Sequence, residues 1–505
     1  GWMMRKNDFD FIKEKFDYCE NDLPMGLETK HIEYKILTDR KHKTIKFRQK
    51  KNHKPLLSAA ACFILVLGIV CTAALMHMNS DKASTFTDYD ELNTMVAPLD
   101  KTISTGGRGG PLKTHKYIQT DGVENADVIK SDGEYIYYAV WTELNNNSVY
   151  IYKSGENDNA PLAVINDLCP DETEEGDLYD VNCIFVYHNR LVVNISKRNY
   201  SLSEKCGRDL SITITKIYDI TDKSSPLLIS EFEQSGEYTS AKMIGSILYV
   251  STNYNLSDNN VLPWIKQGSE TVYASPEDIA RFENAQVAQY AVISAYDVET
   301  EENAEQLKAV LGGDADVKCT KDSIYITEYP QYTSEGELAQ NDDRKIIKLD
   351  LKKMEFLYAD REEIKQLSAD VEINRYEAFT GVVYDIGDMF LCIGEDLNTV
   401  QNEIILYDEN MVEIDSMVLD SMQLLSLNLF RNEDTGEFVL PVYSADSEQR
   451  NYGIAVFRIN NSKIEMTNSF FNDELMINGN HHFIMIGDEF YCVGEDEKLY
   501  SFNYR

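Results

Sequence analysis

A short pattern of polar and apolar positions returns seven times along the chain. Each copy begins with a pair of turn residues, continues with an apolar strand, and after a variable gap reaches a second strand that often ends in an aromatic–Asp pair, as at Tyr218-Asp219. Such strands bounded by turn residues are typical of antiparallel sheets. The turn pairs are Asp132-Gly133, His188-Asn189, Ile244-Gly245, Lys321-Asp322, Ile386-Gly387, Thr435-Gly436 and Ile486-Gly487.

The spacing of these pairs indicates how the strands assemble. Successive turn pairs are 56, 56, 77, 65, 49 and 51 residues apart. A small sheet cannot bury both faces alone, and repeats of several tens of residues are typical of blades arranged around a channel. We therefore predict an all-β fold, a β-propeller of about seven four-stranded blades over residues 114–505, with six or eight as alternatives. The longest spacings predict long loops between strands.

The two ends of the predicted propeller raise the question of ring closure. The chain ends two residues after the second strand of the seventh unit, so the last blade is expected to lack its outermost strand. An unpaired strand edge leaves backbone donors and acceptors open. We expect residues 115–120, which precede the first unit, to supply the missing strand.

A different pattern precedes the repeats. Residues 55–76 contain no charged side chain, and 22 residues at the helical rise span about 30 Å of hydrocarbon. Basic residues crowd the N-terminal side of this run: Arg40, Lys41, Lys43, Lys46, Arg48, Lys50, Lys51 and Lys54. This asymmetry predicts one transmembrane helix at 55–78, a cytoplasmic N-terminus and an extracellular propeller. A cleaved signal peptide ending near Thr72-Ala73-Ala74 is the alternative, but 54 preceding residues are far more than a signal peptide carries.

Two segments flank the predicted membrane helix. Residues 1–54 show two short amphipathic patterns, which indicate either a membrane-proximal spacer or a docking module for a cytoplasmic partner. Residues 79–113 are rich in Ser, Thr, Asp and Gly and end in a glycine-rich run at 106–110. That composition predicts a flexible extracellular linker.

The net charge changes sign at the start of the predicted membrane helix, from positive before residue 55 to negative after it. The whole chain carries −37 at neutral pH, and residues 1–54 contain 14 Lys and Arg against 9 Asp and Glu, so the remainder carries −42. An exported domain this acidic repels nucleic acid and anionic lipid. Cationic surfaces of partners, or divalent metals, are favoured instead.

The nine cysteines support neither a zinc site nor a redox motif, because no C-x-x-C pair exists. Cys392 and Cys492 occupy matched strands and are expected to be buried as small apolar side chains. The only disulfides considered are Cys183 with Cys206 or with Cys169.

The segment that enters the first repeat carries a resemblance to a known family. Residues 117–137 read Tyr-Ile-Gln-Thr-Asp-Gly-Val-Glu-Asn-Ala-Asp-Val-Ile-Lys-Ser-Asp-Gly-Glu-Tyr-Ile-Tyr. This closely resembles the entry motif of a secreted bacterial β-propeller domain family distantly related to tryptophan–aspartate repeats. Glu124-Asn125 stands where that family has Asp-Glu, which removes a carboxylate and weakens any claim of a metal cage. The resemblance implies an exported, membrane-tethered propeller and carries no activity to any residue.

Candidate chemistry is sparse. The chain lacks a sialidase Asp box, a Gly-x-Ser-x-Gly elbow and the quinoprotein repeat, so an enzyme is uncertain and less favoured. A hydrolase or lyase with a carboxylate pair in the channel stays open, because such a pair needs no contiguous motif. No cofactor is expected; calcium is a weak alternative at the acidic loop 167–180, which lacks calcium-loop spacing. His481-His482 are neighbours that point to opposite faces of a strand, so they are not expected to bind one metal.

Four residues are candidate binding residues. Asp121, Glu124 and Asp127 lie in the entry motif, where capping a turn or pairing with Lys130 is the more ordinary role. Trp264 lies in an apolar tract inside the longest insertion, roughly 253–290, and is either packed over the propeller or offered to a partner.

These observations predict a surface module. We expect it to bind or scaffold an extracellular protein or glycan at the cell surface. A transmembrane sensor that signals through residues 1–54 is the alternative.

Overall fold

The computed structural model describes residues 82–99, 115–117, 122–140, 147–155, 160–170, 175–206, 209–256, 262–283, 285–300, 307–329, 346–360, 363, 379–396, 399–432, 435–444, 451–472, 475, 482–494 and 496–503. The predicted cytoplasmic stub and membrane helix lie outside these residues, as do Asp121 and His481. Among the described helices, none combines the length and the apolar character needed to cross a membrane.

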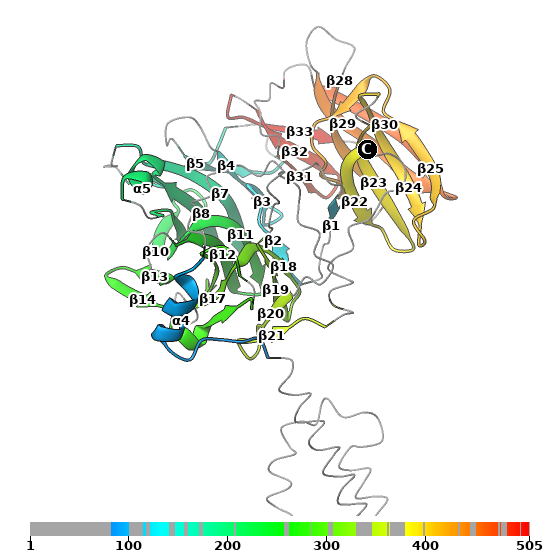
Figure 1. Ribbon diagram of the computed structural model, residues 1–505. Helices are drawn as coiled ribbons and strands as arrows, with labels where there is room; N and C mark the ends of the chain where they lie inside the picture. The colour runs from blue at the N-terminus through cyan, green and yellow to red at the C-terminus, as the bar shows by residue number, and fades with distance from the viewer. Residues whose placement is uncertain are drawn as a thin grey trace, which may run out of the picture. The chain divides into compact units, whose positions relative to one another are not determined.

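The described residues form mainly strands, which confirms the all-β class. The helices are α4 (Tyr89–Val96), α5 (Tyr200–Cys206) and the 3-10 helix η2 (Pro276–Asp278). The strands assemble into seven sheets, numbered here in chain order (Figure 1). Each contains an up-and-down run of antiparallel strands, and sheets 2, 3 and 5 also contain strands from other parts of the chain.

Sheets 1 to 4 contain the first four of the seven repeats. Sheet 1 has the order β3 (Ile129–Ser131), β4 (Tyr135–Val140), β5 (Ser148–Lys153), β6 (Ala163–Ile165). Sheet 2 has β7 (Leu178–Tyr187), β8 (Arg190–Arg198), β9 (Ile212–Asp219), β10 (Leu227–Ser235), β13 (Trp264–Gln267), β14 (Glu270–Tyr273). Sheet 3 has β2 (Glu124–Asn125), β11 (Glu237–Ile244), β12 (Ile247–Asn255), β16 (Gln289–Asp297), β17 (Leu307–Leu311), β15 (Ile279–Arg281). Sheet 4 has β18 (Gly313–Cys319), β19 (Ser323–Glu328), β20 (Ile346–Asp350), β21 (Glu355–Tyr358).

Sheets 5 to 7 follow. Sheet 5 has β1 (His115–Tyr117), β22 (Phe379–Asp385), β23 (Met389–Asp396), β24 (Gln401–Asp408), β25 (Glu413–Val418). Sheet 6 has β26 (Met422–Leu424), β28 (Phe438–Ser444), β29 (Tyr452–Asn460), β30 (Lys463–Asn472), with β27 (Phe430–Arg431) also on β28. Sheet 7 has three strands in the described part of the chain, β31 (Phe483–Ile486), β32 (Glu489–Val493), β33 (Leu499–Asn503).

The repeated turn pairs lie where the sequence places them. Each connects an early strand of its sheet to the next, as Asp132-Gly133 connects β3 to β4. Six of the seven pairs contain a residue with positive φ, such as Gly133 at +95°. Only glycine and a few polar residues adopt this conformation cheaply, so the turn residues fix the strand register.

Apolar clusters join neighbouring sheets. Clusters of buried side chains connect sheet 1 to 2, 2 to 3, 3 to 4, 5 to 6 and 6 to 7. A further cluster connects sheet 7 back to sheet 1 through residues such as Ile136, Tyr152 and Tyr491. The described residues contain no such cluster shared by sheets 4 and 5.

The prediction for closure is wrong. Residues 115–117 do not pair with the last sheet; β1 runs parallel to β22 in sheet 5, with His115 opposite Val382. The first and last sheets meet face to face instead, and Tyr152 Oη donates to the carbonyl of Glu497 at 2.8 Å. Burial of apolar side chains between two faces holds sheets together without an exchanged strand.

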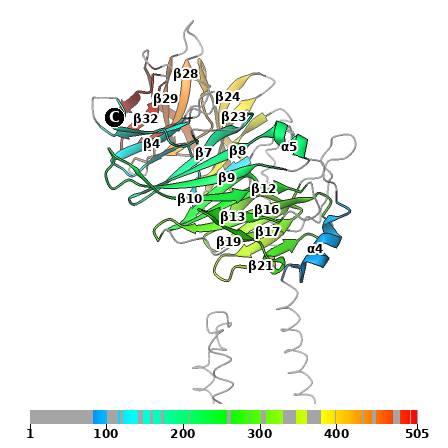
Figure 2. The ribbon, with the colours of Figure 1, turned by 90° about the vertical axis from the view of Figure 1, so that its left-hand side faces the viewer.

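Part of the predicted flexible linker is ordered. Residues 82–87 form bridges to sheets 3 and 4, and α4 follows with Asp88 as its N-cap, its side chain accepting from the Glu91 amide. Figures 1 and 2 show α4 (blue) beside the strands of sheet 3. Although residues 79–113 are mostly polar, four apolar side chains of the segment are buried: Ala83, Phe86, Leu92 and Val96.

Candidate functional site

The entry motif connects three sheets within eight residues. Glu124 and Asn125 form β2, which pairs with β11 so that Asn125 lies opposite Lys242. Asp127 forms an isolated bridge to Ile184 of β7, and its carbonyl accepts from the Ile184 amide at 2.7 Å. The chain then enters sheet 1 as β3. This motif therefore ties sheets 1, 2 and 3 together at the ends of their strand orders.

Two lysine ammonium groups converge on Asn125. Lys130 Nζ donates to the Asn125 carbonyl at 2.7 Å, forms an ion pair with Glu124 at 2.9 Å, and lies 5.4 Å from the ring centre of Phe185. Lys242 Nζ donates to Asn125 Oδ1 at 2.8 Å. Burial lowers the pKa of Lys242, because the charged form loses hydration there.

Asp127 is held by its own turn and by His482, the residue before β31. Its Oδ1 accepts from the Val128 amide at 2.7 Å and lies 3.4 Å from His482 Nδ1. Burial alone would raise the pKa of Asp127, but contacts with His482, the Val128 amide and Lys130 outweigh it and lower the pKa. The Tyr138 ring lies beside His482, with centroids 6.5 Å apart.

These contacts match the ordinary roles expected for the motif. Glu124 pairs with Lys130, and Asp127 caps its turn. Asp121 lies outside the described residues. Whether any of the three binds a ligand stays a prediction. Sequence reasoning missed Lys242 and the contact of Asp127 with His482, since both contacts span more than 100 residues.

The cysteines behave as small apolar side chains. Cys169 and Cys183 are free, so neither forms the disulfide considered from the sequence. Cys392 and Cys492 are buried, as predicted, and burial raises the pKa of the Cys392 thiol to about 12. A thiol this hard to ionise is a poor nucleophile.

The acidic loop is partly neutralised by its neighbours. Asp177 pairs with Lys197 at 2.9 Å, and Asp180 pairs with Arg198. The described part of the chain holds no group of three or more His, Cys, Asp or Glu side chains that could bind a metal ion. Residues 171–174 of the loop lie outside that part, so calcium stays a prediction.

The long insertion forms regular structure around Trp264. Residues 264–273 fold into a hairpin, β13–β14, that lengthens sheet 2 beyond β10. Trp264 is half-buried and lies opposite Tyr273, which is 58% exposed; the Trp264 amide donates to Ser235 Oγ at 3.0 Å. Every residue of β14 is exposed.

The two faces of this hairpin differ. Ile265 is buried in the cluster between sheets 2 and 3, and Val272 opposite it is 49% exposed. Trp264 and Tyr273 share the other face, because they form a cross-strand pair one position along. Sequence reasoning found Trp264 but missed Tyr273.

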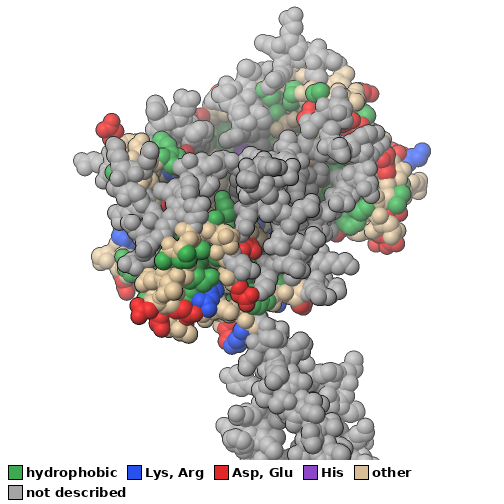
Figure 3. All heavy atoms as spheres, viewed as in Figure 1, with side chains coloured by type: hydrophobic (Ala, Val, Ile, Leu, Met, Phe, Trp, Pro, Cys, Tyr) green, Lys and Arg blue, Asp and Glu red, His purple; other side chains and the backbone are tan. Residues whose placement is uncertain are grey.

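Acidic side chains are spread over the described surface. Figure 3 shows Asp and Glu groups at several separate places on one face of the molecule. This distribution agrees with the strongly negative charge of the sequence.

Comparison with known proteins identifies the class. The fold is that of a β-propeller, and the sequence matches the family described as "Beta propeller domain" over residues 116–418. This match covers more than half of the chain, which therefore belongs to that family. No curated protein matches the sequence.

Solved structures resemble the chain weakly. A putative 6-phosphogluconolactonase from Bacteroides fragilis has 10% identity and a TM-score of 0.34, with 75% of this chain and 93% of that chain covered. The β-propeller domain of the trilobed protease from Pyrococcus furiosus has 11% identity and a TM-score of 0.33, covering 76% and 96%. The acylaminoacyl peptidase of Pyrococcus horikoshii has 12% identity and a TM-score of 0.30, covering 75% and 60%. None of these likenesses carries an activity to the present chain.

Proposed function

We propose that the protein is a membrane-anchored, extracellular propeller of about seven blades that binds or scaffolds a protein or glycan at the bacterial cell surface. Each of the seven sheets would be one blade. The observation that carries the proposal is the hairpin β13–β14, whose edge strand is wholly exposed. A rigid scaffold that displays an aromatic pair on a projecting hairpin is a common arrangement for recognition.

The hairpin offers two modes of contact to a protein. Among the described strands, β14 is the last of sheet 2, and its outer edge can pair with an extended segment of the partner through backbone hydrogen bonds. Trp264 and Tyr273 add apolar area on one face, and aromatic residues dominate the energetics of interfaces. The acidic surface favours a partner with basic side chains.

The hairpin hypothesis predicts the effect of Trp264→Ala. Partner capture from cell-surface extract, or binding on a glycan array, should weaken by about 2 kcal/mol, roughly thirtyfold. Because Trp264 is half-buried, folding should stay nearly intact. A thermal melt of the variant beside wild type tests whether folding is intact. A loss of about 3 kcal/mol or more of stability would contradict the binding role of Trp264. Val412→Ala, at an exposed apolar residue before β25, is the matched control and should leave binding unchanged.

The proposed orientation has its own test. The basic residues before residue 55 support an N-terminus inside and a propeller outside. Protease shaving of intact cells should release fragments from beyond residue 78 and spare an epitope tag at the N-terminus. Loss of the tag under shaving would contradict this orientation.

A transmembrane sensor is the second candidate. The contacts of residues 82–99 with the insertion favour it, because they connect the segment after the predicted membrane helix to the proposed binding element. Pull-down from cytosol with residues 1–54 separates the candidates: a specific cytoplasmic partner supports the sensor, and its absence supports the scaffold.

A further inference from the structure

Residues 82–99, called the clip here, bond to two sheets through their backbone. Lys82 bridges Leu357 of β21 in sheet 4, and the Ala83 amide donates to the Phe356 carbonyl at 3.1 Å. Thr85 bridges Ala280 of β15 in sheet 3. Backbone pairing of this kind is directional and fixes the register of the segment against both sheets.

The sheet 3 contacts fall on the insertion that carries the hairpin. The Phe86 amide donates to the Ile279 carbonyl at 3.3 Å, and the Arg281 amide donates to the Ser84 carbonyl at 3.0 Å. β15 contains both Ile279 and Arg281 and begins six residues after β14 ends. The clip thus extends sheet 3 beyond β15, the strand that follows the hairpin in the chain.

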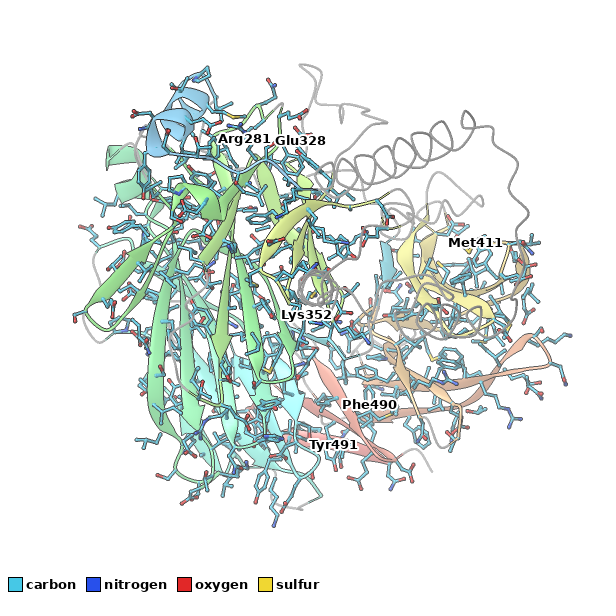
Figure 4. The ribbon with its side chains drawn as sticks, turned by 90° about the horizontal axis from the view of Figure 1, so that it is seen from below. Arg281, Glu328, Lys352, Met411, Phe490 and Tyr491 are labelled. Carbon is cyan, nitrogen blue, oxygen red and sulfur yellow. The ribbon has the colours of Figure 1, made fainter. Side chains whose placement is uncertain are left out.

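Arg281 fastens the clip by its side chain as well. Its guanidinium lies 2.7 Å from Glu91 Oε1 and 4.7 Å from the Phe86 ring centre. Figure 4 shows Arg281 beside α4. The Thr87 amide and hydroxyl both donate to Glu91 Oε2 at 2.9 Å, and these bonds, with Arg281, lower the pKa of Glu91. Glu91 is therefore oriented toward Arg281 in its charged form.

The clip and the hairpin share one apolar cluster. Phe86, which is 1% exposed, and Leu92 and Val96 of α4 belong to the cluster that contains Ile265 of β13 and Ala274 after β14. Interiors are closely packed, so removal of one member leaves a void that its neighbours fill only in part. Loss of the clip would therefore loosen the packing of the cluster in which Ile265 of the hairpin is buried.

We propose that the clip regulates the hairpin: seated, it holds the insertion in binding-ready order, and a pull on the segment before Lys82 that releases it loosens β13–β14. This inference rests on the hairpin being the binding element. Binding and release are linked, since a partner that favours the ordered hairpin also favours the seated clip. Tension from the membrane side would lower affinity for the partner.

Hydrogen exchange of the full chain in detergent tests this coupling without a partner. Phe86→Ala should raise exchange of backbone amides in residues 264–281 about tenfold, together with those of 82–96, because the shared cluster loses a member. The exchange rates of peptides from sheets 5 and 6 should stay unchanged. Faster exchange confined to 82–96 would overturn the coupling.

A second pair of variants guards against a general folding defect. Arg281→Met removes the ion pair and the ring contact but keeps length, and should raise exchange in 264–281 severalfold. Lys82→Met removes only an exposed ion pair with Glu355, at 3.4 Å, and should leave 264–281 unchanged. Equal effects of both variants would contradict the assigned role of Arg281. The exchange and capture experiments can fail separately. If Phe86→Ala and Arg281→Met raise exchange as expected but Trp264→Ala captures the partner as well as wild type, the coupling stands and only the binding site is overturned.

Discussion

Tyr152→Ala is expected to separate the first and last sheets and to lower the free energy of unfolding by about 4 kcal/mol. Tyr152 is 1% exposed, packs in the cluster shared by sheets 1 and 7, and donates to the carbonyl of Glu497, 345 residues away. Truncation removes the ring that fills this interface and leaves the Glu497 carbonyl without its donor. Chemical denaturation measures the loss, and hydrogen exchange should rise first in β32 and β33.

The control for this interface is Tyr152→Phe. It removes the hydrogen bond and keeps the ring, so the expected loss is about 1 kcal/mol. If the alanine variant were as stable as the phenylalanine variant, the contact between sheets 1 and 7 would not be what closes the fold. Figure 4 shows Phe490 and Tyr491 on β32. This strand belongs to sheet 7, and Tyr491 lies in the cluster that both variants perturb.

Gly453→Ala should destabilise sheet 6 by about 3 kcal/mol. Gly453 lies opposite Phe471 on the pair β29–β30, and a Cβ atom there would overlap the carbonyl oxygen of Phe470. Because the obstacle is backbone, the two strands must move apart and strain their ladder. The melting temperature of the variant checks the prediction.

Gly487→Ala is the matched control for that substitution. A Cβ on Gly487 meets nothing within 4 Å, so only its positive φ of +58° opposes alanine, at a cost of roughly 1 kcal/mol. A Gly453→Ala protein as stable as Gly487→Ala would contradict the close approach of β29 and β30.

The local parts of the fold were predictable. Turn pairs such as Asp132-Gly133 and Ile486-Gly487 require particular backbone conformations, and the apolar runs behind them become β4 and β32. Both signals lie within a few residues of each other. The strands and their repetition could therefore be predicted from the sequence, and the match to the β-propeller family agrees with this prediction.

Closure and the clip could not be predicted because they depend on distant packing. The pairing of β1 with β22 joins residues 115 and 382, and nothing in His115–Tyr117 distinguishes that partner from the last blade. Phe86, Leu92 and Val96 stand among polar residues, so composition alone suggests a linker. Only the cluster they enter shows their role.

In the candidate site, too, local contacts could be predicted and distant contacts could not. Glu124 and Lys130 are six residues apart, so their ion pair followed from the motif. Lys242, Arg281 and His482 gain their roles from Asn125, Glu91 and Asp127, which lie 117, 190 and 355 residues away in the chain. Tyr273 needed the register of the hairpin to be placed beside Trp264.

The parallel pairing of β1 with β22 has a consequence for synthesis. His115 leaves the ribosome 267 residues before Val382, its partner in sheet 5. At about 5–20 residues per second, the three residues of β1 wait on the order of 10–50 s for that partner, and β2 to β21 are synthesised in that interval. β1 is thus made before the other described strands, yet it can pair in sheet 5 only after β22 has been synthesised.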